Sequence, residues 1–314
     1  MIAALLSDEG VPAPHREERV ELADGRTIGI AEYGDAHGRA VLWFPGTPGG
    51  RRQIPPRAVA VARARGIRLI GIERPGIGDS TPHLYPSVLG WADDVAEVTT
   101  RLGVGRFALV GLSGGGPYVL ACAHRLAHRV VAGAVLGGVA PALGEDAAAG
   151  GAMSLATRLA AVVHTLREPL AVAVWATAFA LRPLASGAFD LAVSAMPPGD
   201  REVMRRPEMK AMFLDDMLLA GRRQLHAPVY DIVLFTRPWG FSPRDVRVPI
   251  RFWHGDADPI VPLEHAHHLA ALVPDAELRV RPGEGHMGNL DAAEEILDTL
   301  LAFWPAEADR PPPR

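Results

Sequence analysis

A serine in a glycine-rich turn is the feature that most constrains what this chain can fold into. Residues 111–115 have the sequence Gly-Leu-Ser-Gly-Gly, between a short apolar run, 106–110, and a run of helix-forming residues, 118–126. Glycines two positions before and after Ser113 suit a very sharp strand-to-helix turn, because side chains there would collide with the neighbouring chain. Such a turn, called a nucleophile elbow, holds its serine in strained backbone angles at the amino end of a helix. The pattern predicts that Ser113 is a nucleophile.

The rest of the chain alternates short apolar runs with helical patterns. Continuous apolar runs of this kind are typical of strands buried on both faces of a parallel sheet. The alternation therefore predicts an α/β fold, with helices on both faces of a mostly parallel sheet. Before the first such run, residues 17–32 predict an antiparallel hairpin that turns at Asp24-Gly25. The predicted strands are 40–44, 67–72, 106–110, 130–136, 248–254 and 277–281, and the predicted helices are 58–65, 87–102 with Ser87 as its N-cap, 118–126, 263–272 and 290–303.

The alternation is interrupted by a long segment between the fourth and fifth of these strands. The segment is helical in pattern, has no clear buried strand, and is divided by prolines into about four short helices. We therefore expect a core domain with a helical cap inserted into it. The expected core is 15–140 and 244–304, the expected cap is 141–243, and 1–14 and 305–314 are expected to be flexible tails.

A serine hydroxyl is a weak nucleophile unless a base takes its proton, and the base works best when a buried carboxylate orients it. In an open parallel sheet such groups gather at the carboxyl ends of the strands. Two downstream segments meet this requirement: 254–262 carries Asp256 and Asp258, and 282–288 carries His286. These residues are the candidates for the acid and the base.

The other histidines have simpler explanations. His265, His267 and His268 lie on a predicted helix, where a solvated or partly buried helix face is expected and no metal-binding partners are evident. His124 and His128 have a spacing that could bind a metal, but they lie well along the helix after the elbow, which favours a structural role. We expect no metal and no cofactor.

Three motifs in the order serine, acid, histidine make the chain similar to the α/β-hydrolase superfamily. The resemblance extends from about residue 17 to about residue 303. The resemblance implies that Ser113 attacks the substrate, that His286 is the base, and that Asp258 rather than Asp256 orients it. The matching motifs are Gly-x-Ser-x-Gly at 111–115, a glycine followed three residues later by aspartate and then Val-Pro at 255–262, and Gly-x-Gly-His at 283–286.

The resemblance also implies where an oxyanion would be stabilised. The family's His-Gly-x-Pro-Gly loop corresponds to 45–49, so the backbone N–H groups of Thr47 and of Gly114, the residue after the nucleophile, are the implied donors. Pro45 stands where the family usually has histidine. The loop 73–80 resembles the family's Asp-x-Pro-Gly-x-Gly-x-Ser, with Glu73 in the acid position, and is expected to be a structural turn near the site.

The function implied is that of a serine hydrolase, resembling a carboxylesterase, that cleaves a carboxylic ester or related acyl bond of a small, mainly apolar substrate through an acyl-enzyme on Ser113. A C–C bond hydrolase or an aminopeptidase on the same triad, and a non-catalytic ligand-binding protein on this fold, are the alternatives. Ser113 argues against dehalogenases and most epoxide hydrolases, which have aspartate at the elbow. The methionines and aromatic residues of the cap are expected to form its own small core, and the alternative is that several line the substrate pocket. They are Met153, Met196, Met204, Met209, Met212, Met217, Trp175, Phe179 and Phe213.

Composition argues against several other classes. The 314 residues carry a net charge of −4 with scattered arginines, so neither a nucleic acid nor a membrane surface is an expected partner. The single cysteine, Cys122, excludes an intrachain disulfide and lies where a buried structural thiol is expected. The first residues lack the pattern of a signal peptide, and the longest apolar run, 170–181, is too short to span a bilayer. We expect a cytoplasmic protein that binds a small-molecule substrate.

Overall fold

The structure of the chain, a computed structural model, describes residues 11–148 and 151–305, so most of the predicted tails 1–14 and 305–314 lies outside the described residues. The strands are β1 Arg16–Glu21, β2 Thr27–Gly34, β3 Arg39–Phe44, β4 Ile67–Ile72, β5 Phe107–Leu112, β6 Val130–Leu136, β7 Ile250–Gly255 and β8 Ala276–Arg281. They form one sheet in the order β1-β2-β4-β3-β5-β6-β7-β8. β2 is antiparallel to β1 and β4, and the other neighbours are parallel. The predicted sheet with its N-terminal hairpin is confirmed.

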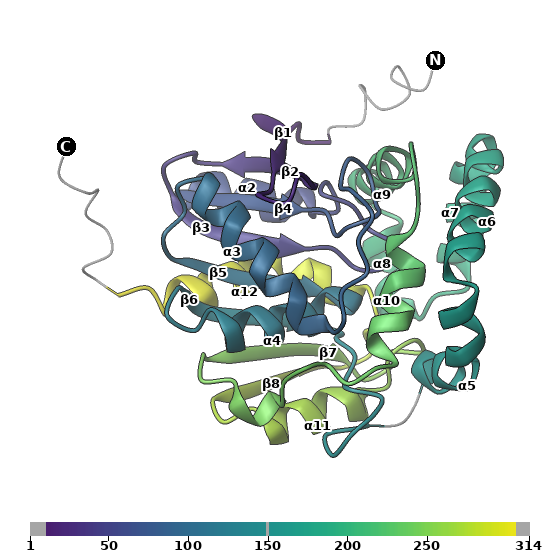
Figure 1. Ribbon diagram of the computed structural model, residues 1–314. Helices are drawn as coiled ribbons and strands as arrows, with labels where there is room; N and C mark the ends of the chain where they lie inside the picture. The colour runs from purple at the N-terminus through teal and green to yellow at the C-terminus, as the bar shows by residue number, and fades with distance from the viewer. Residues whose placement is uncertain (1–10, 149–150, 306–314) are drawn as a thin grey trace.

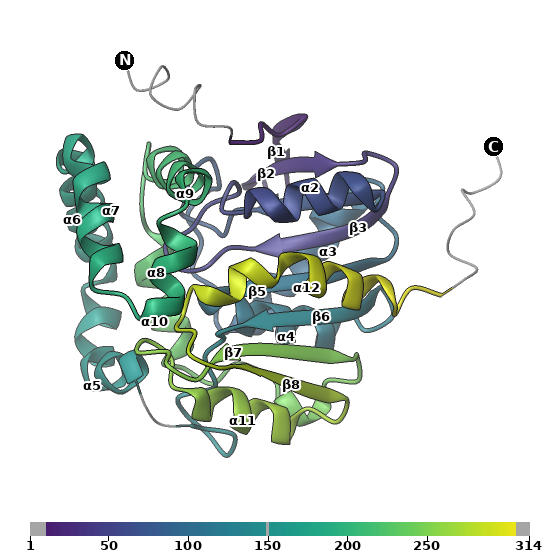
Figure 2. The same cartoon turned by 180° about the vertical axis from the view of Figure 1, so that it is seen from behind.

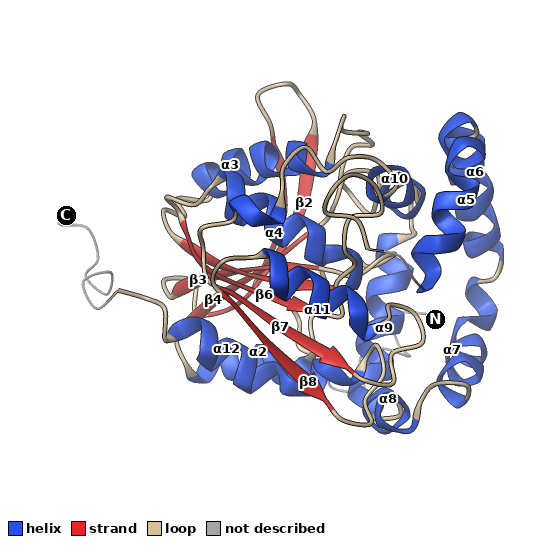
Figure 3. Cartoon of the chain, turned by 90° about the horizontal axis from the view of Figure 1, so that it is seen from below, coloured by secondary structure: helices blue, strands red, loops and turns tan. Residues whose placement is uncertain are grey.

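Helices cover both faces of this sheet. One face carries α2 Pro56–Ala64 and α12 Ala293–Leu301, and the other carries α3 Trp91–Arg101, α4 Gly116–Arg125 and α11 Leu263–Leu272. Figures 1 and 2 each show one of these layers in front, and Figure 3 shows the strands between them. Side chains that alternate along each strand feed two separate cores: in β3, Leu42 and Phe44 enter one, and Val41 and Trp43 enter the other.

The predicted helix 87–102 begins differently from the expectation. A 3-10 turn, Val88–Gly90, precedes α3, and the Ser87 side chain makes no cap hydrogen bond. A capping serine would accept a hydrogen bond from the N–H of Leu89 or Gly90. Here the Leu89 N–H donates to the Trp239 carbonyl oxygen at 3.1 Å, and the Gly90 N–H donates to the Ser87 carbonyl oxygen at 3.2 Å. Ser87 is therefore wrong as a side-chain cap, because main-chain carbonyls satisfy these amides.

A helical insertion lies between β6 and β7, where the sequence predicts it. Its described residues form six α-helices rather than about four: α5 Gly151–Thr165, α6 Arg167–Ala180, α7 Ala185–Ser194, α8 Pro198–Met204, α9 Pro207–Ala220 and α10 Ala227–Phe235. The break between α5 and α6 falls at Leu166, three residues before Pro169 in the first turn of α6. In Figure 1, α8, α9 and α10 lie next to the core and α5, α6 and α7 lie outermost.

The helices α5 and α6 bear on the question of a membrane. No single helix within the described ranges is long and apolar enough to cross a bilayer. The pair Leu155–Thr165 and Arg167–Ala180 meets that test together by length and composition alone, and it is bent by 104°.

Candidate active site

The turn at Ser113 has the geometry of a nucleophile elbow. Ser113 directly follows β5, and α4 begins three residues later. Its φ is 50°, and within the described ranges it is the one non-glycine residue with positive φ. A Cβ on Gly111 would lie 2.6 Å from the Gly115 carbonyl oxygen, and a Cβ on Gly115 would overlap the Phe44 carbonyl oxygen. Because these obstacles are main-chain atoms, both positions require glycine.

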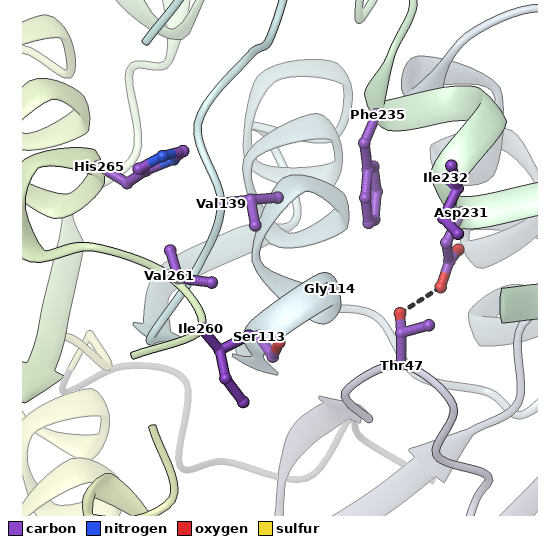
Figure 4. Close-up of a pocket in the computed structure, with 10 residues that line it drawn as sticks. All are labelled: Thr47, Ser113, Gly114, Val139, Asp231, Ile232, Phe235, Ile260, Val261 and His265. Carbon is purple, nitrogen blue, oxygen red and sulfur yellow. Dashed lines mark hydrogen bonds between the residues drawn. The ribbon is translucent and has the colours of Figure 1, made fainter. Parts of the chain in front are cut away.

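Ser113 borders an apolar cavity of about 150 Å³. An engineered apolar cavity of about 150 Å³ in another protein binds benzene, so this space suits a group of that size. Figure 4 shows how core loops and the insertion close around it. Its lining residues are Thr47, Ser113, Gly114, Val139, Asp231, Ile232, Phe235, Ile260, Val261 and His265.

A buried carboxylate–imidazole pair lies close to the elbow. Asp258 Oδ2 is 2.6 Å from His286 Nδ1, and Asp258 Oδ1 accepts the N–H groups of Ile260 at 2.8 Å and Val261 at 2.9 Å. Burial opposes ionisation of this carboxyl, but hydrogen bonds from His254 and His286 outweigh it and hold the pKa of Asp258 well below its usual value. The imidazole is thus fixed by an ionised partner.

Asp256 occupies a different environment from Asp258. Its Oδ1 accepts the Gly283 N–H at 2.7 Å, and the residue is exposed. That bond ties together the loops after β7 and β8, which carry Asp258 and His286. Of the two candidate acids, the structure places Asp258 against His286.

Ser113 and His286 approach the same turn after β6. A Cβ on Gly137 would lie 3.3 Å from the His286 ring, and a Cβ on Gly138 would lie 3.9 Å from the Ser113 carbonyl oxygen. No hydrogen bond joins the two side chains among the described residues. Catalytic hydrogen bonds often tighten only when substrate binds, so the missing bond is compatible with the predicted pair.

Thr47 and Gly114 are in contact beside Ser113. Thr47 lies in the loop after β3, and a Cβ on Gly114 would overlap Thr47 Oγ1. In the part of the chain that is described, the Thr47 N–H donates to no acceptor. The Gly114 N–H belongs to the turn that begins a helix, where amides lack helical acceptors. The two residues implied as donors therefore lie together at the cavity.

Comparison with known proteins gives the family. A sequence model of the alpha/beta hydrolase fold matches residues 39–293. The chain belongs to the alpha/beta hydrolase fold family. The fold, motif order and elbow predicted from sequence agree with this membership.

Solved structures from several bacteria share the whole fold of this alpha/beta hydrolase. An esterase from Thermogutta terrifontis is 19% identical over 91% of this chain and 96% of its own, with a TM-score of 0.62. An esterase from a Rhodococcus species is 21% identical over 92% and 99%, with a TM-score of 0.63. A bromoperoxidase from Bacillus anthracis is 20% identical over 92% and 99%, with a TM-score of 0.66. At these identities the likeness establishes the fold and leaves the substrate open.

Two residues of this alpha/beta hydrolase were not singled out by sequence reasoning. Arg74 and Asp231 form an ion pair at 2.9 Å with side chains only 2% and 3% exposed. Arg74 also donates to the carbonyl oxygens of Pro45 at 2.6 Å and Gly46 at 3.1 Å, and Asp231 accepts the Thr47 hydroxyl (Figure 4). The loop that lacks the family's histidine is thus held by a guanidinium. The position of Arg74 inside the glycine-rich loop 73–80 was the one sequence feature that could have indicated its role. No sequence feature indicated a role for Asp231.

Glu73, which takes the acid position of the loop 73–80, has the environment of a structural residue. Glu73 is fully buried, and its carboxylate accepts the Asp79 N–H at 2.9 Å and lies 3.1 Å from Arg51 Nη1. Burial outweighs the attraction of Arg51 and raises the pKa of Glu73 to about 7. A Cβ on Gly29 would lie 2.7 Å from Arg51 Nη1, so this pair packs directly under the N-terminal hairpin.

His254 was also assigned no role from sequence. It is 1% exposed, and its Nε2 lies 2.8 Å from the Val261 carbonyl oxygen and 3.4 Å from Asp258 Oδ2. It therefore fixes the ends of the loop that carries the acid. His254 directly precedes Gly255, the last residue of β7, and this place at the end of a strand could have indicated a role near the site.

One expectation about the surroundings of the site was wrong, and for the methionines and aromatic residues of the insertion the cavity does not support the alternative. His265 is fully buried, whereas a solvated or partly buried helix face was expected; its Nδ1 accepts the Ala140 N–H at 3.0 Å, and it lines the cavity. The insertion contributes Asp231, Ile232 and Phe235 to the lining, all from α10. None of the named methionines and aromatics that are described lines this cavity, and the Met153 side chain lies outside the described part.

The environment of Cys122 is the expected one, that of a buried structural thiol. Cys122 is fully buried on α4, and burial raises the pKa of its thiol well above the usual value. Within 11–148 and 151–305, no group of three or more histidine, cysteine, aspartate or glutamate side chains could hold a metal ion.

Proposed function

We propose that the chain is a serine hydrolase that cleaves a carboxylic ester, or a related acyl bond, of a small and mainly apolar substrate. The observation that carries the proposal is the strained Ser113, with φ of 50°, on the wall of an apolar cavity. Strain at a serine persists only where the surrounding structure holds it, and such positions cluster at active sites. Family membership supports a hydrolase, and the ester bond is our inference.

In the reaction, Ser113 Oγ attacks the substrate carbonyl carbon while His286 Nε2 takes the hydroxyl proton. Asp258 keeps the proton of His286 on Nδ1 and stabilises the imidazolium that forms. The N–H groups of Thr47 and Gly114 donate to the oxyanion of the tetrahedral intermediate. The imidazolium returns its proton to the leaving alcohol, and an acyl-enzyme on Ser113 remains. Water, activated by His286, then releases the acid and restores the serine.

The cavity limits the substrate group that lies next to the reacting bond. Five apolar side chains line it, namely Val139, Ile232, Phe235, Ile260 and Val261. About 150 Å³ accommodates a short acyl chain or one ring. We expect butyrate and benzoate esters to be better substrates than esters of long-chain acids.

The decisive test is covalent labelling by a fluorophosphonate probe, combined with hydrolysis of p-nitrophenyl esters. Ser113→Ala should abolish both, because the nucleophile is removed. Ser194→Ala is the matched control, since Ser194 lies exposed on α7 and donates only to the Leu191 carbonyl oxygen. Full labelling of Ser113→Ala would place the nucleophile elsewhere.

A substrate panel separates the proposal from its alternatives. The panel contains p-nitrophenyl esters, aminoacyl-naphthylamides and a vinylogous diketone. Turnover of the esters alone supports the proposal. Preference for the naphthylamides or the diketone would assign an aminopeptidase or a C–C bond hydrolase, and stoichiometric retention of a ligand without turnover would assign a binding protein.

A further inference from the structure

Three aspartates of the insertion point away from solvent and onto core loops. Asp200 on α8, Asp216 on α9 and Asp231 on α10 are 1%, 2% and 2% exposed. Carboxylates are rarely buried this completely unless hydrogen bonds or cations compensate for lost hydration. Their partners therefore show what the burial achieves.

Asp200 holds the loop that carries His286. Its Oδ1 accepts the N–H groups of Gly285 at 2.9 Å and Gly288 at 2.7 Å, which lie on either side of His286 in sequence. A Cβ on Gly285 would lie 2.5 Å from Asp200 Oδ2, so glycine there permits the approach. No cation lies within salt-bridge distance of this carboxylate among the described residues. Hydrogen bonds from amides to a charged acceptor are about twice as strong as neutral ones.

Asp216 holds the loop that follows Thr47. Its Oδ2 accepts the Gly50 N–H at 2.8 Å, and its Oδ1 accepts the Arg52 N–H at 2.9 Å. A Cβ on Gly50 would lie 3.0 Å from Asp216 Oδ1. Each carboxylate oxygen therefore has one main-chain donor, within five residues of Thr47.

Asp231 acts on the same loop from its other side. Its Oδ2 accepts from the Thr47 hydroxyl and from Arg74, and its Oδ1 accepts the Tyr118 hydroxyl at 2.7 Å. Tyr118 belongs to α4, the helix that begins at the elbow. One carboxylate thus joins the insertion, the elbow helix and the loop with the implied oxyanion donor.

We propose that Asp200, Asp216 and Asp231 are positioning residues, through which the insertion sets the placement of His286 and of the Thr47 N–H. This inference rests on the proposed function, because those two groups are its base and one of its oxyanion donors. Misplacing a reacting group by about 1 Å can cost on the order of 10²-fold in rate. The insertion therefore supports turnover as well as covering the site.

Asp200 gives the sharpest test, because both of its donors share one oxygen. An asparagine can offer its amide oxygen to the same two N–H groups, and alanine can offer none. We expect Asp200→Ala to lower kcat for p-nitrophenyl butyrate by at least about tenfold with KM within about threefold. We expect Asp200→Asn to stay within about threefold of wild type.

The matched control is Asp190→Ala. Asp190 lies on α7, its side chain is 61% exposed, and it pairs with Lys210 at 2.8 Å. We expect its kcat and KM to equal those of wild type. Hydrogen–deuterium exchange of the peptide 283–290 should rise in Asp200→Ala and stay unchanged in Asp190→Ala.

Several results would overturn the positioning role. They are a folded Asp200→Ala with wild-type kcat, an Asp200→Asn as impaired as Asp200→Ala, or unchanged exchange of 283–290. If Asp200→Ala does not fold, the kcat values of Asp200→Asn and Asp216→Asn are compared. Asparagine keeps both hydrogen bonds at position 200 but only one of the two at position 216. Equal kcat in those two variants then overturns the role. Wild-type protein that fluorophosphonate does not label refutes the proposed function instead, and the exchange data still test the bracing of the loop.

Discussion

Replacing Asp258 with asparagine should invert the proton placement on His286. Asp258 Oδ1 already accepts two N–H groups, at 2.8 and 2.9 Å, so the asparagine oxygen must take that side. Its NH₂ group then faces His286 Nδ1, where the carboxylate oxygen lay at 2.6 Å. A ring nitrogen that accepts from an amide carries no proton, so the proton moves to Nε2. That tautomer cannot take the proton of Ser113.

The magnitude follows from comparing the two amide orientations. In the other orientation, the asparagine oxygen would face His286 and restore the original tautomer. Its NH₂ group would then face the N–H groups of Ile260 and Val261, which costs about 1–3 kcal/mol for each unsatisfied group. The wrong tautomer lowers turnover by on the order of 10⁴, about 5 kcal/mol in the barrier. We expect Asp258→Asn to lose about 10⁴-fold in kcat with KM little changed.

The assay is steady-state hydrolysis of p-nitrophenyl butyrate, with thermal unfolding to establish that the variant is folded. Asp256→Asn is the matched control, because Asp256 contributes one exposed hydrogen bond to Gly283 and does not contact the imidazole. It should keep kcat within about threefold of wild type. A folded Asp258→Asn within tenfold of wild type, or a larger loss in Asp256→Asn, would refute this reasoning.

Three further predictions test other parts of the structure. Gly115→Ala should reduce both fluorophosphonate labelling and melting temperature, because its Cβ would overlap the Phe44 carbonyl oxygen; a wild-type labelling rate would contradict this. Phe235→Ala should enlarge the cavity, cost about 3–5 kcal/mol in the free energy of unfolding, and raise the kcat/KM ratio of octanoate to butyrate esters about tenfold. The raised pKa of Glu73, about 7 in the folded state against 4.5, means that the wild-type free energy of unfolding falls as pH rises from about 4 to about 8. Glu73→Gln should remove about 3 kcal/mol of that fall in denaturant titrations, and identical pH dependence in both proteins would exclude the effect.

The elements of the core could be predicted because their signals are local. The strand Ile67–Ile72 and the helix Leu263–Leu272 have the predicted bounds, since an apolar run of strand length and an amphipathic pattern are properties of a few consecutive residues. The sequence pattern of the elbow is equally local, although the atom that requires glycine at position 115, the Phe44 carbonyl oxygen, belongs to a distant strand. Helix starts were harder: the Leu89 N–H near Ser87 donates to the carbonyl oxygen of Trp239, far along the chain.

The sequence by itself determined the order of strands and helices, the family, and the residues proposed for the reaction, because these depend on residue type and spacing. Only the tertiary structure decided which polar groups support them. Arg74 and Asp231 are 157 residues apart and pair because the start of α10 packs on the loop after β4, where the Gly76 carbonyl oxygen accepts the Ala227 N–H. His265 lines the cavity for the same kind of reason, since the packing of α11 buries it. Burial and long-range pairing depend on how elements pack together, and no local pattern encodes that.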